Sequence, residues 1–263
     1  MDIHKQSIVD PKAKIGKNVT ISAFAMIDAD VVIGDNCWIG PFASIQNGTR
    51  MGNNCQIFQG AIIGSIPQDL KFEGEESVLE IGDNTIVREY CTLNRGTKAG
   101  YRTVVGSNCL LMAYVHIAHD CIVGDNVILA NNVTLAGHIE IGDFAVLGGL
   151  TAVHQFVKIG EHAMIGGGSL VHKDVPPFVK ASRDPLSYAG VNSIGLGRRG
   201  FTPEQQQSIA DIYRVIFVKG NNISQSVNNV KEKFPESAEK SKILDFIGQS
   251  ERGLMKGLRS GLK

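Results

Sequence analysis

A parallel β-helix of hexapeptide repeats, followed by an α-helical domain at the carboxyl end, is the fold class that this sequence predicts. Two observations indicate the β-helix: a large aliphatic residue recurs at every sixth position from Ile3 to Val171, and a small residue usually stands two positions before it. Of the 29 positions in phase, only Asp69, Glu75 and Ala99 depart from this rule. Short strands joined at corners explain a period of six, whereas an α-helix would need spacings of three and four. The helical domain is indicated by the loss of this repeat and the appearance of helical spacing in the last quarter of the chain.

The composition is that of a folded protein without an excess of either charge. The chain has 263 residues, of which 26 are basic and 26 acidic, and 43% of the residues are hydrophobic. Because no excess cations are present to neutralise phosphates, neither a nucleic acid nor an anionic membrane is expected as the main partner. The amino terminus lacks the basic and apolar regions of a signal peptide, and no run of about 18 apolar residues could span a bilayer. We therefore expect a cytoplasmic protein.

Residues 1–189 are expected to form the β-helix. Three hexads per coil would place residues 18 apart directly above one another, at a strand spacing of roughly 4.8 Å. The stretches 64–77 and 94–103 interrupt the repeat. We expect both to project from the β-helix as loops, where functional residues are common.

Residues 190–263 are expected to form a helical domain that covers the open end of the β-helix. The segment Thr202-Pro203-Glu204-Gln205 combines an N-cap residue, a proline in the first turn and a capping box. Apolar residues at helical spacing follow as far as Phe217, and further helices fit residues 223–234 and 236–250.

The cysteines are expected to fill the core. All five occupy the small inward position of a hexad: Cys37, Cys55, Cys91, Cys109 and Cys121. Buried cysteine behaves as a small hydrophobic residue, and disulfides are not expected in a chain without a secretion signal. The same placement excludes cysteine as a covalent nucleophile, and neither a G-x-S-x-G elbow nor a nucleotide P-loop is present.

Histidines gather at one corner of the predicted β-helix. The 18-residue stacking places four imidazoles there, together with an aspartate and a glycine: His116, His119, His138, His154, Asp120 and Gly137. Because imidazoles titrate near neutral pH, such a cluster is typical of a functional site, although scattered surface histidines would show the same spacing. A metal site built from His116, His119 and Asp120 with His138 or His154, as in the β-helical carbonic anhydrases, is a second alternative. No ligand signature of a structural zinc site supports it.

General base catalysis fits this cluster better than metal binding. A neutral imidazole can take the proton of a hydroxyl group while the hydroxyl oxygen attacks an activated acyl carbon. Because no nucleophilic side chain is available, the transfer would be direct rather than through an acyl-enzyme. Gly137 would offer an unobstructed backbone N–H as an oxyanion donor, one coil away from His119.

Seven segments carry a resemblance to one family. They are Ser65-Ile66-Pro67-Gln68-Asp69-Leu70-Lys71, His116-Ile117-Ala118-His119-Asp120, Leu129-Ala130-Asn131-Asn132, Leu135-Ala136-Gly137-His138, Ala152-Val153-His154-Gln155-Phe156, Asp174-Val175-Pro176-Pro177 and Gly197-Arg198-Arg199-Gly200-Phe201. This ordered set resembles the UDP-N-acetylglucosamine 3-O-acyltransferases of lipid A biosynthesis over essentially the whole chain. The resemblance implies a left-handed parallel β-helix, a hand that the spacing alone does not determine.

The resemblance also implies roles for individual residues. His119 would be the general base, supported by Asp120, and the Gly137 N–H would be the oxyanion donor. The sugar and its phosphates would be bound by Gln68, Asp69, Lys71, His116, His138 and Gln155. The nucleotide or the donor's phosphopantetheine would be held by His154, Asn192, Arg198 and Arg199. Gly167 would stand where a bulky residue shortens the preferred acyl chain.

One of these roles conflicts with strand geometry. Adjacent residues of a strand normally point to opposite faces, which argues against a contact between His119 and Asp120.

The reaction implied by the resemblance is the first step of lipid A biosynthesis. An (R)-3-hydroxyacyl group would pass from acyl carrier protein to the 3-hydroxyl of UDP-N-acetylglucosamine, in a cytoplasmic homotrimer with its sites between neighbouring prisms. No metal or dissociable cofactor is expected apart from the carrier's own phosphopantetheine. Two groups of basic residues are candidate binding sites for the acidic carrier protein: Arg198 and Arg199, and the tail residues Arg252, Lys256, Arg259 and Lys263. Solvated helix faces explain the tail residues equally well.

Two departures from the family pattern leave alternatives open. Asn94 stands before Arg95-Gly96-Thr97 where histidine is usual, and Ile194 stands where glutamate is common. Both positions concern acceptor contacts, and the sequence does not distinguish a 3-hydroxyl from a 3-amino acceptor. The related N-acyltransferases place a globular domain before the β-helix, whereas this repeat begins at Ile3. A coenzyme A-dependent sugar acetyltransferase and a non-catalytic β-helix are the remaining alternatives.

Overall fold

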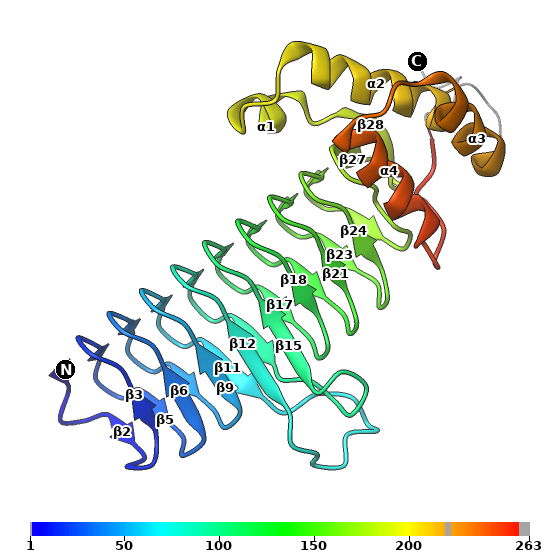
Figure 1. Ribbon diagram of the computed structural model, residues 1–263. Coiled ribbons are helices and arrows are strands. Elements are labelled where there is room, and N and C mark those ends of the chain that lie inside the picture. Colours follow the sequence, from blue (N-terminus) through cyan, green and yellow to red (C-terminus); the bar gives the residue numbers. More distant parts are fainter. Residues whose placement is uncertain (1, 219–221, 258–263) are drawn as a thin grey trace.

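The computed structural model describes residues 2–218 and 222–257. It shows a left-handed parallel β-helix with a helical domain at one end and the amino terminus at the other (Figure 1). Three sheets of 11, 9 and 8 strands form the sides of a prism. The fold class predicted from the repeat is therefore confirmed.

The strands are short, and most have only two residues. The 11-stranded sheet contains β1 (Asp2–Ile3), β4 (Thr20–Ile21), β7 (Trp38–Ile39), β10 (Gln56–Ile57), β13 (Ile86–Val87), β16 (Leu110–Leu111), β19 (Ile128–Leu129), β22 (Val146–Leu147), β25 (Met164–Ile165), β27 (Val179–Ser182) and β28 (Ser187–Val191). The 9-stranded sheet contains β2 (Ile8–Val9), β5 (Met26–Ile27), β8 (Ser44–Ile45), β11 (Ile62–Ser65), β14 (Thr92–Asn94), β17 (His116–Ile117), β20 (Thr134–Leu135), β23 (Ala152–Val153) and β26 (Leu170–Val171). The 8-stranded sheet contains β3 (Lys14–Ile15), β6 (Val31–Ile33), β9 (Thr49–Met51), β12 (Val78–Ile81), β15 (Arg102–Val105), β18 (Ile122–Val123), β21 (Glu140–Ile141) and β24 (Lys158–Ile159).

The register confirms the predicted stacking of residues 18 apart. His116 pairs with Thr134 on the next coil, for example. The two predicted loops project from the prism at residues 66–77, between β11 and β12, and at 95–101, between β14 and β15 (cyan to green in Figure 1). Because these loops lengthen their coils, the pairing offset grows locally, and Thr92 pairs with His116.

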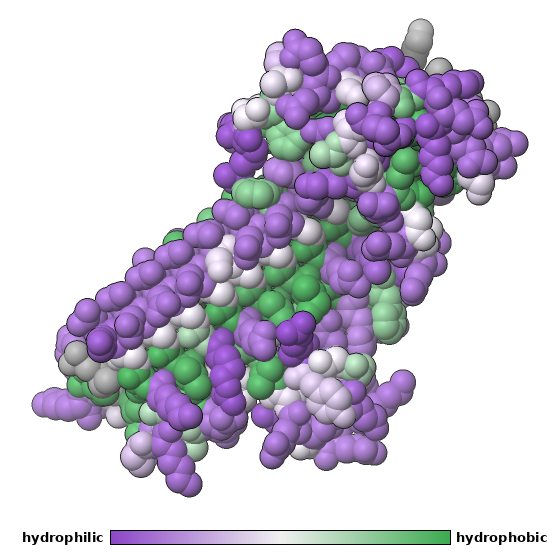
Figure 2. All heavy atoms as spheres, in the orientation of Figure 1, coloured by the Kyte–Doolittle hydropathy of each residue, from purple (hydrophilic) through white to green (hydrophobic). Residues whose placement is uncertain are grey.

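The core is thin and consists mainly of aliphatic and small side chains. The aliphatic residue of most hexads is almost fully buried, as Ile21 and Ile117 are. The five cysteines are all buried and unpaired, as predicted. Figure 2 shows that the projecting loops and the outer face of the helical domain are largely hydrophilic.

The corners of the prism require left-handed backbone, which asparagine adopts more readily than most residues. One edge accordingly carries a column of asparagines, among them Asn18 with φ of 54° and Asn36 with φ of 58°. The amide of Asn18 donates to Oδ1 of Asn36 at 3.1 Å, and Asn54 and Asn84 are joined in the same way. These side-chain bonds run along the prism axis and support the coil-to-coil stacking.

The carboxyl-terminal part begins with the antiparallel pair β27 and β28 and continues with four helices. These are α1 (Ser193–Arg198), α2 (Pro203–Phe217), α3 (Ile223–Lys233) and α4 (Ala238–Gly248). The capping box predicted for α2 is present, with Gln205 N donating to Thr202 Oγ1 at 3.3 Å and Thr202 N donating to Gln205 Oε1 at 2.9 Å. The expected boundary between residues 189 and 190 falls inside β28. Arg259 and Lys263 lie outside the described residues. Among the helices described, none has the length and apolar character needed to cross a membrane.

Candidate active site

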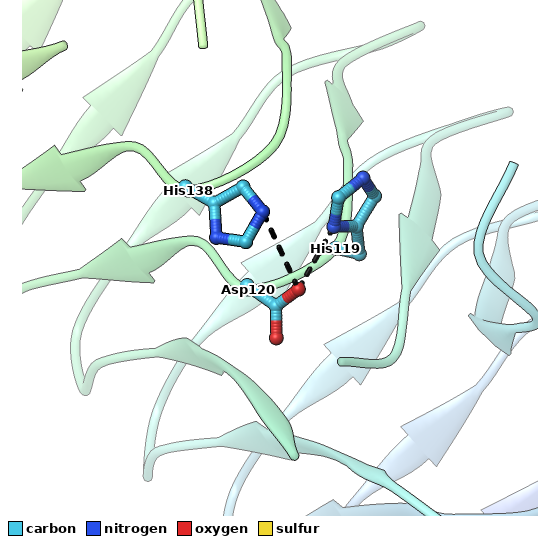
Figure 3. Close-up of side chains that lie close together, drawn as sticks. All are labelled: His119, Asp120 and His138. Atoms are coloured by element: carbon cyan, nitrogen blue, oxygen red, sulfur yellow. Dashed lines mark hydrogen bonds and ion pairs between the residues drawn. The ribbon is translucent and has the colours of Figure 1, made fainter. Parts of the chain in front are cut away.

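His119, Asp120 and His138 lie together at the corner between the 9- and 8-stranded sheets (Figure 3). The first two residues follow β17, and His138 follows β20 one coil further on. Nδ1 of His119 is 2.8 Å from Oδ2 of Asp120, and Nε2 of His138 is 3.9 Å from the same oxygen. The stacking arithmetic therefore placed His119 and His138 correctly as neighbours.

The expectation that His119 and Asp120 point apart is wrong. Asp120 belongs to the corner rather than to the strand, and its φ of 58° is left-handed. Side chains alternate between faces only along extended backbone. The turn of the chain at Asp120 brings its carboxylate back to the imidazole of the preceding residue.

The carboxylate of Asp120 is held by hydrogen bonds from the loop at residues 95–101. Thr97 donates twice, from its backbone N to Oδ1 at 3.0 Å and from Oγ1 to Oδ2 at 2.6 Å. The Gly100 N–H also donates to Oδ1, at 3.2 Å. Burial alone would raise the pKa of Asp120, but the hydrogen bonds from Thr97 and His119 outweigh it, so this pKa lies below its ordinary value.

An ionised Asp120 determines which nitrogen of neutral His119 carries the proton. A carboxylate can only accept hydrogen bonds, so the 2.8 Å contact requires the proton on Nδ1. Nε2 of the neutral ring then has a free lone pair and can act as a base. The pair thus has the arrangement of a general base oriented by a carboxylate.

Gly137 packs directly against the His119 ring. A Cβ at Gly137 would lie 2.6 Å from Cε1 and 2.8 Å from Nε2 of His119, closer than real Cβ atoms come, so the ring would have to shift. Among the described residues, no hydrogen bond uses the Gly137 N–H, so this donor is free beside the basic nitrogen. A glycine is therefore needed here, and its backbone offers a donor for a developing oxyanion.

His138 completes the corner through its ring contacts. It stacks on Phe156 with ring centroids 4.6 Å apart and meets the His119 ring edge-on at 5.1 Å. Burial lowers the pKa of His138, while the carboxylates of Asp120 and Asp69 act in the opposite direction. The Lys98 N–H donates to Oε1 of Glu75 at 2.8 Å, which brings the loop at residues 66–77 against the turn that holds Asp120.

The same three side chains have the composition of a small metal site, with ligand atoms within 4.8 Å of one another. Their existing contacts favour proton transfer over metal binding. Both oxygens of Asp120 already accept hydrogen bonds from Thr97 and Gly100, and Oδ2 also contacts His119 Nδ1. A metal ion would have to displace these donors to reach the carboxylate.

Two of the histidines expected at this corner, His116 and His154, make other contacts. Nδ1 of His116 lies 2.7 Å from Thr92 Oγ1. Burial lowers the pKa of His116, although a hydrogen bond with the Thr92 backbone opposes it. His154 is exposed, with its ring centroid 5.7 Å from that of His172. Over the described ranges, neither imidazole has a hydrogen bond or ring contact with His119, Asp120 or His138.

The loop at residues 66–77 carries three of the residues that were expected to bind the sugar and its phosphates. Gln68 and Lys71 are exposed, and Oδ1 of Asp69 accepts a hydrogen bond from the Lys71 N–H at 3.0 Å. Asn94 has a different place from the one expected. Only 2% of it is exposed, and its amide donates to the Ile66 carbonyl at 3.1 Å, so it anchors the start of the loop.

The remaining predicted residues lie elsewhere on the prism. Gln155 is exposed next to His154. Asn192 is buried, caps α1 and donates to the His162 carbonyl at 2.9 Å. Two others are grouped at α1 and the turn after it, where Arg198 is exposed and the guanidinium of Arg199 lies 4.7 Å above the Phe144 ring.

The predicted site residues therefore occupy all three edges of one prism. His119 lies between the 9- and 8-stranded sheets, and Phe144, beneath Arg199, lies between the 8- and 11-stranded sheets. Gly167 is exposed at the third edge, between β25 and β26. A single prism does not bring these groups to one place.

Sequence reasoning missed the residues that hold the Asp120 carboxylate, Thr97 and Gly100. The only signal was that the loop at 94–103 interrupts the repeat, which marked the segment without identifying its contacts. His172, the ring neighbour of His154, was also missed, although it lies 18 residues further along the same column.

Comparisons with known proteins agree with the fold and identify related enzymes. The family model described as UDP-N-acetylglucosamine O-acyltransferase, domain 2, matches residues 174–255, and the bacterial transferase hexapeptide model matches residues 30–65 and 102–137. The acyl-[acyl-carrier-protein]–UDP-N-acetylglucosamine O-acyltransferase of Sulfurihydrogenibium sp. is 54% identical, covering 97% of this chain and 94% of that protein. The protein of the same name from Chlorobium phaeobacteroides is 57% identical, covering 95% of this chain and 96% of that protein. Among solved structures, a UDP-N-acetylglucosamine acyltransferase from Bacteroides fragilis superposes with a TM-score of 0.95 at 48% identity, covering 97% of this chain and 100% of that one.

Proposed function

The chain belongs to the UDP-N-acetylglucosamine O-acyltransferase family, and from this premise we propose the reaction that its corner residues carry out. The enzyme transfers an (R)-3-hydroxyacyl chain from acyl carrier protein to the 3-hydroxyl of UDP-N-acetylglucosamine, the first step of lipid A biosynthesis. The proposal is carried by one observation: Nδ1 of His119 is held by Asp120, while neither Nε2 of His119 nor the neighbouring Gly137 N–H has a hydrogen-bond partner among residues 2–218 and 222–257.

The proposed mechanism uses these groups in one direct transfer. Nε2 of His119 takes the proton of the 3-hydroxyl while its oxygen attacks the thioester carbonyl carbon. The carbonyl oxygen becomes an oxyanion, which accepts a hydrogen bond from the Gly137 N–H. When the tetrahedral intermediate collapses, the carbon–sulfur bond breaks and the imidazolium returns its proton to the departing thiolate. Asp120 stabilises the imidazolium throughout, and it needs no proton of its own.

The proposed binding residues form two groups, one for the sugar and its phosphates and one for the nucleotide or the donor's phosphopantetheine. Asp69, Gln68 and Lys71 are on the projecting loop that contacts the turn at residues 95–101, which fits them for the sugar and phosphates. His116, His138 and Gln155 are proposed for the same ligand. Four residues are proposed for the nucleotide or the phosphopantetheine: His154, Asn192, Arg198 and Arg199.

A homotrimer is proposed because one prism leaves an apolar edge uncovered and its site residues apart. Along the edge that contains Gly167, exposed apolar side chains form a row: Phe24, Phe42, Tyr90, Tyr114 and Leu150. Leu150 is 69% exposed and Phe42 is 64% exposed, and a row of this kind is typical of a protein interface. Packing prisms side by side would cover the row and bring groups from different edges into one cleft. A cytoplasmic location is proposed as well, since five unpaired cysteines suit a reducing compartment.

The proposed function is tested by product analysis with purified protein. UDP-N-acetylglucosamine is incubated with a panel of hydroxyacyl thioesters of acyl carrier protein, with matched coenzyme A thioesters, and with the 3-amino analogue of the sugar nucleotide. Mass spectrometry should find ester-linked product with the carrier-protein donors and far less with coenzyme A. Product only from the 3-amino analogue would replace the hydroxyl acceptor, and no product from any donor would refute the proposal. Light scattering on the same preparation tests the trimer.

A further inference from the structure

The turn at residues 95–101 surrounds one carboxylate with donors and leaves it almost no freedom. The side chain of Asp120 is only 3% exposed. Its Oδ1 accepts the backbone N–H groups of Thr97 and Gly100, and its Oδ2 accepts the Thr97 hydroxyl. The Thr97 residue is itself 6% exposed, so water has little access to these bonds.

In the described part of the chain, the Thr97 hydroxyl donates its hydrogen bond to Oδ2 of Asp120. Its oxygen accepts a hydrogen bond from the Ala99 N–H at 3.3 Å. The hydroxyl hydrogen is then directed to Oδ2 of Asp120 at 2.6 Å, a short bond of the kind formed between a hydroxyl and a carboxylate. The same Oδ2 accepts the Nδ1–H of His119, so Thr97 and the imidazole share one oxygen.

The loop that contains Thr97 is itself braced by the neighbouring projecting loop. Oγ of Ser77 donates to the Gly96 carbonyl at 2.5 Å, and the Lys98 N–H donates to Oε1 of Glu75 at 2.8 Å. Both contacts flank Thr97 in sequence, so the position of its hydroxyl is set from outside the turn. The brace comes from the loop that also carries the proposed acceptor residue Asp69.

We propose that Thr97 is a positioning residue for the acyl transfer: its hydroxyl fixes the plane of the Asp120 carboxylate, and this selects the His119 tautomer in which Nε2 is unprotonated. The proposal rests on the proposed function of His119 as the base. Without the hydroxyl, Oδ1 would keep both of its donors, but Oδ2 would be held by the imidazole alone. The carboxylate could then rotate about the Oδ1 contacts, and the ring could adopt the other tautomer.

Thr103 provides a matched control, because it contacts the backbone of Asp120 and not its carboxylate. It is fully buried, and its Oγ1 accepts a hydrogen bond from the backbone N–H of Asp120 at 2.9 Å. Replacing Thr103 by valine therefore removes a buried hydroxyl bonded to the same residue, but leaves every donor to the carboxylate in place. A merely structural role of Thr97 would make the two valine variants behave alike.

The test compares Thr97→Val, Thr97→Ser and Thr103→Val by kinetics. Residues that orient a histidine through a carboxylate are known from metal sites, where their loss lowers activity about ten- to a hundredfold. We expect kcat of Thr97→Val to fall by this factor with KM for UDP-N-acetylglucosamine unchanged, because Thr97 is buried and its hydroxyl is bonded to Asp120. Thr97→Ser keeps the hydroxyl and should restore kcat, and Thr103→Val should stay close to wild type.

A spectroscopic readout makes the test independent of turnover. Nitrogen-15 NMR of labelled histidine in the substrate-free protein at pH 8, assigned with His119→Gln, should show the Nδ1–H tautomer in wild type and in Thr103→Val. Thr97→Val should show a mixture with the Nε2–H form. Unchanged kcat and an unchanged tautomer in Thr97→Val would overturn the proposal, as would equal losses in both valine variants. If wild type showed no acyl transfer, the proposed function would fail, and the tautomer measurement alone would then decide the role of Thr97.

Discussion

The substitution Gly137→Ala tests whether the His119 ring and the Gly137 backbone act as one unit. The three atoms nearest to an added Cβ all belong to the His119 ring, and two of them would lie 2.6 and 2.8 Å away. The backbone of Gly137 is not in the left-handed region, so alanine introduces no backbone strain of its own. The imidazole must therefore move, and its 2.8 Å contact with Asp120 is lost or distorted.

The expected magnitudes follow from this overlap. Overpacking of a tight site costs about 1–3 kcal/mol of unfolding free energy. Misplacing a general base lowers kcat by at least about 10²-fold. Both effects should be visible in purified Gly137→Ala, by denaturant unfolding and by steady-state kinetics.

A double-mutant cycle with His119→Ala isolates the contact. Once the ring is removed, the alanine methyl group at position 137 has free space. In the His119→Ala background, Gly137→Ala should then cost almost no unfolding free energy and cause no further loss of kcat, giving a coupling of about 1–3 kcal/mol. Equal costs in the two backgrounds would refute the reasoning, because the methyl group would then be clashing with something other than His119.

Three further predictions concern other parts of the molecule. Gly167→Met should shift the preference toward shorter acyl donors without loss of fold, because Gly167 is exposed at the edge between β25 and β26, where a long side chain would shorten the space open to an acyl chain. An unchanged profile of kcat/KM against donor length would show that this edge does not set the acyl length. Prolonged chelation should leave activity unchanged, since the oxygens of Asp120 are already occupied by protein donors; activity lost on chelation and restored by a divalent ion would contradict this. Burial between Phe144 and Phe178 lowers the pKa of His162, so below about pH 6.5 the unfolded chain binds more protons than the folded one and stability falls as the pH falls. His162→Phe should therefore show a smaller decrease in Tm between pH 7 and pH 5, and an equally steep decrease in the variant would exclude His162 as the cause.

The repeat made the fold and part of the site predictable. A period of six with 18-residue stacking assigns each residue to a face or corner, and this placed His119, Gly137 and His138 together before any coordinates were known. The arithmetic fails wherever the backbone leaves the repeat geometry. It predicted that His119 and Asp120 diverge, because alternation along a strand does not describe the left-handed corner at Asp120.

Contacts made by inserted segments could not be predicted in this way. Thr97 lies in a loop that interrupts the repeat, so no register relates it to Asp120, 23 residues further along the chain. The positions of Asn192 and Arg199 depend on how β28 and α1 pack on the end of the prism, which the hexads do not encode. Asn94 differs from expectation for a related reason, since the adjacent loop covers it and takes its amide hydrogen bond.

The central claim is that Nε2 of His119 removes the proton of the acceptor hydroxyl. It is tested most directly by kcat of purified His119→Ala, measured with UDP-N-acetylglucosamine and a hydroxyacyl thioester of acyl carrier protein, with product quantified by mass spectrometry. His4→Ala, an exposed histidine on the first coil without an assigned role, is the matched control. We predict that kcat of His119→Ala falls at least about 10²-fold while its oligomeric state and Tm stay native, and that the control retains wild-type turnover. Turnover close to wild type in folded His119→Ala would contradict the claim.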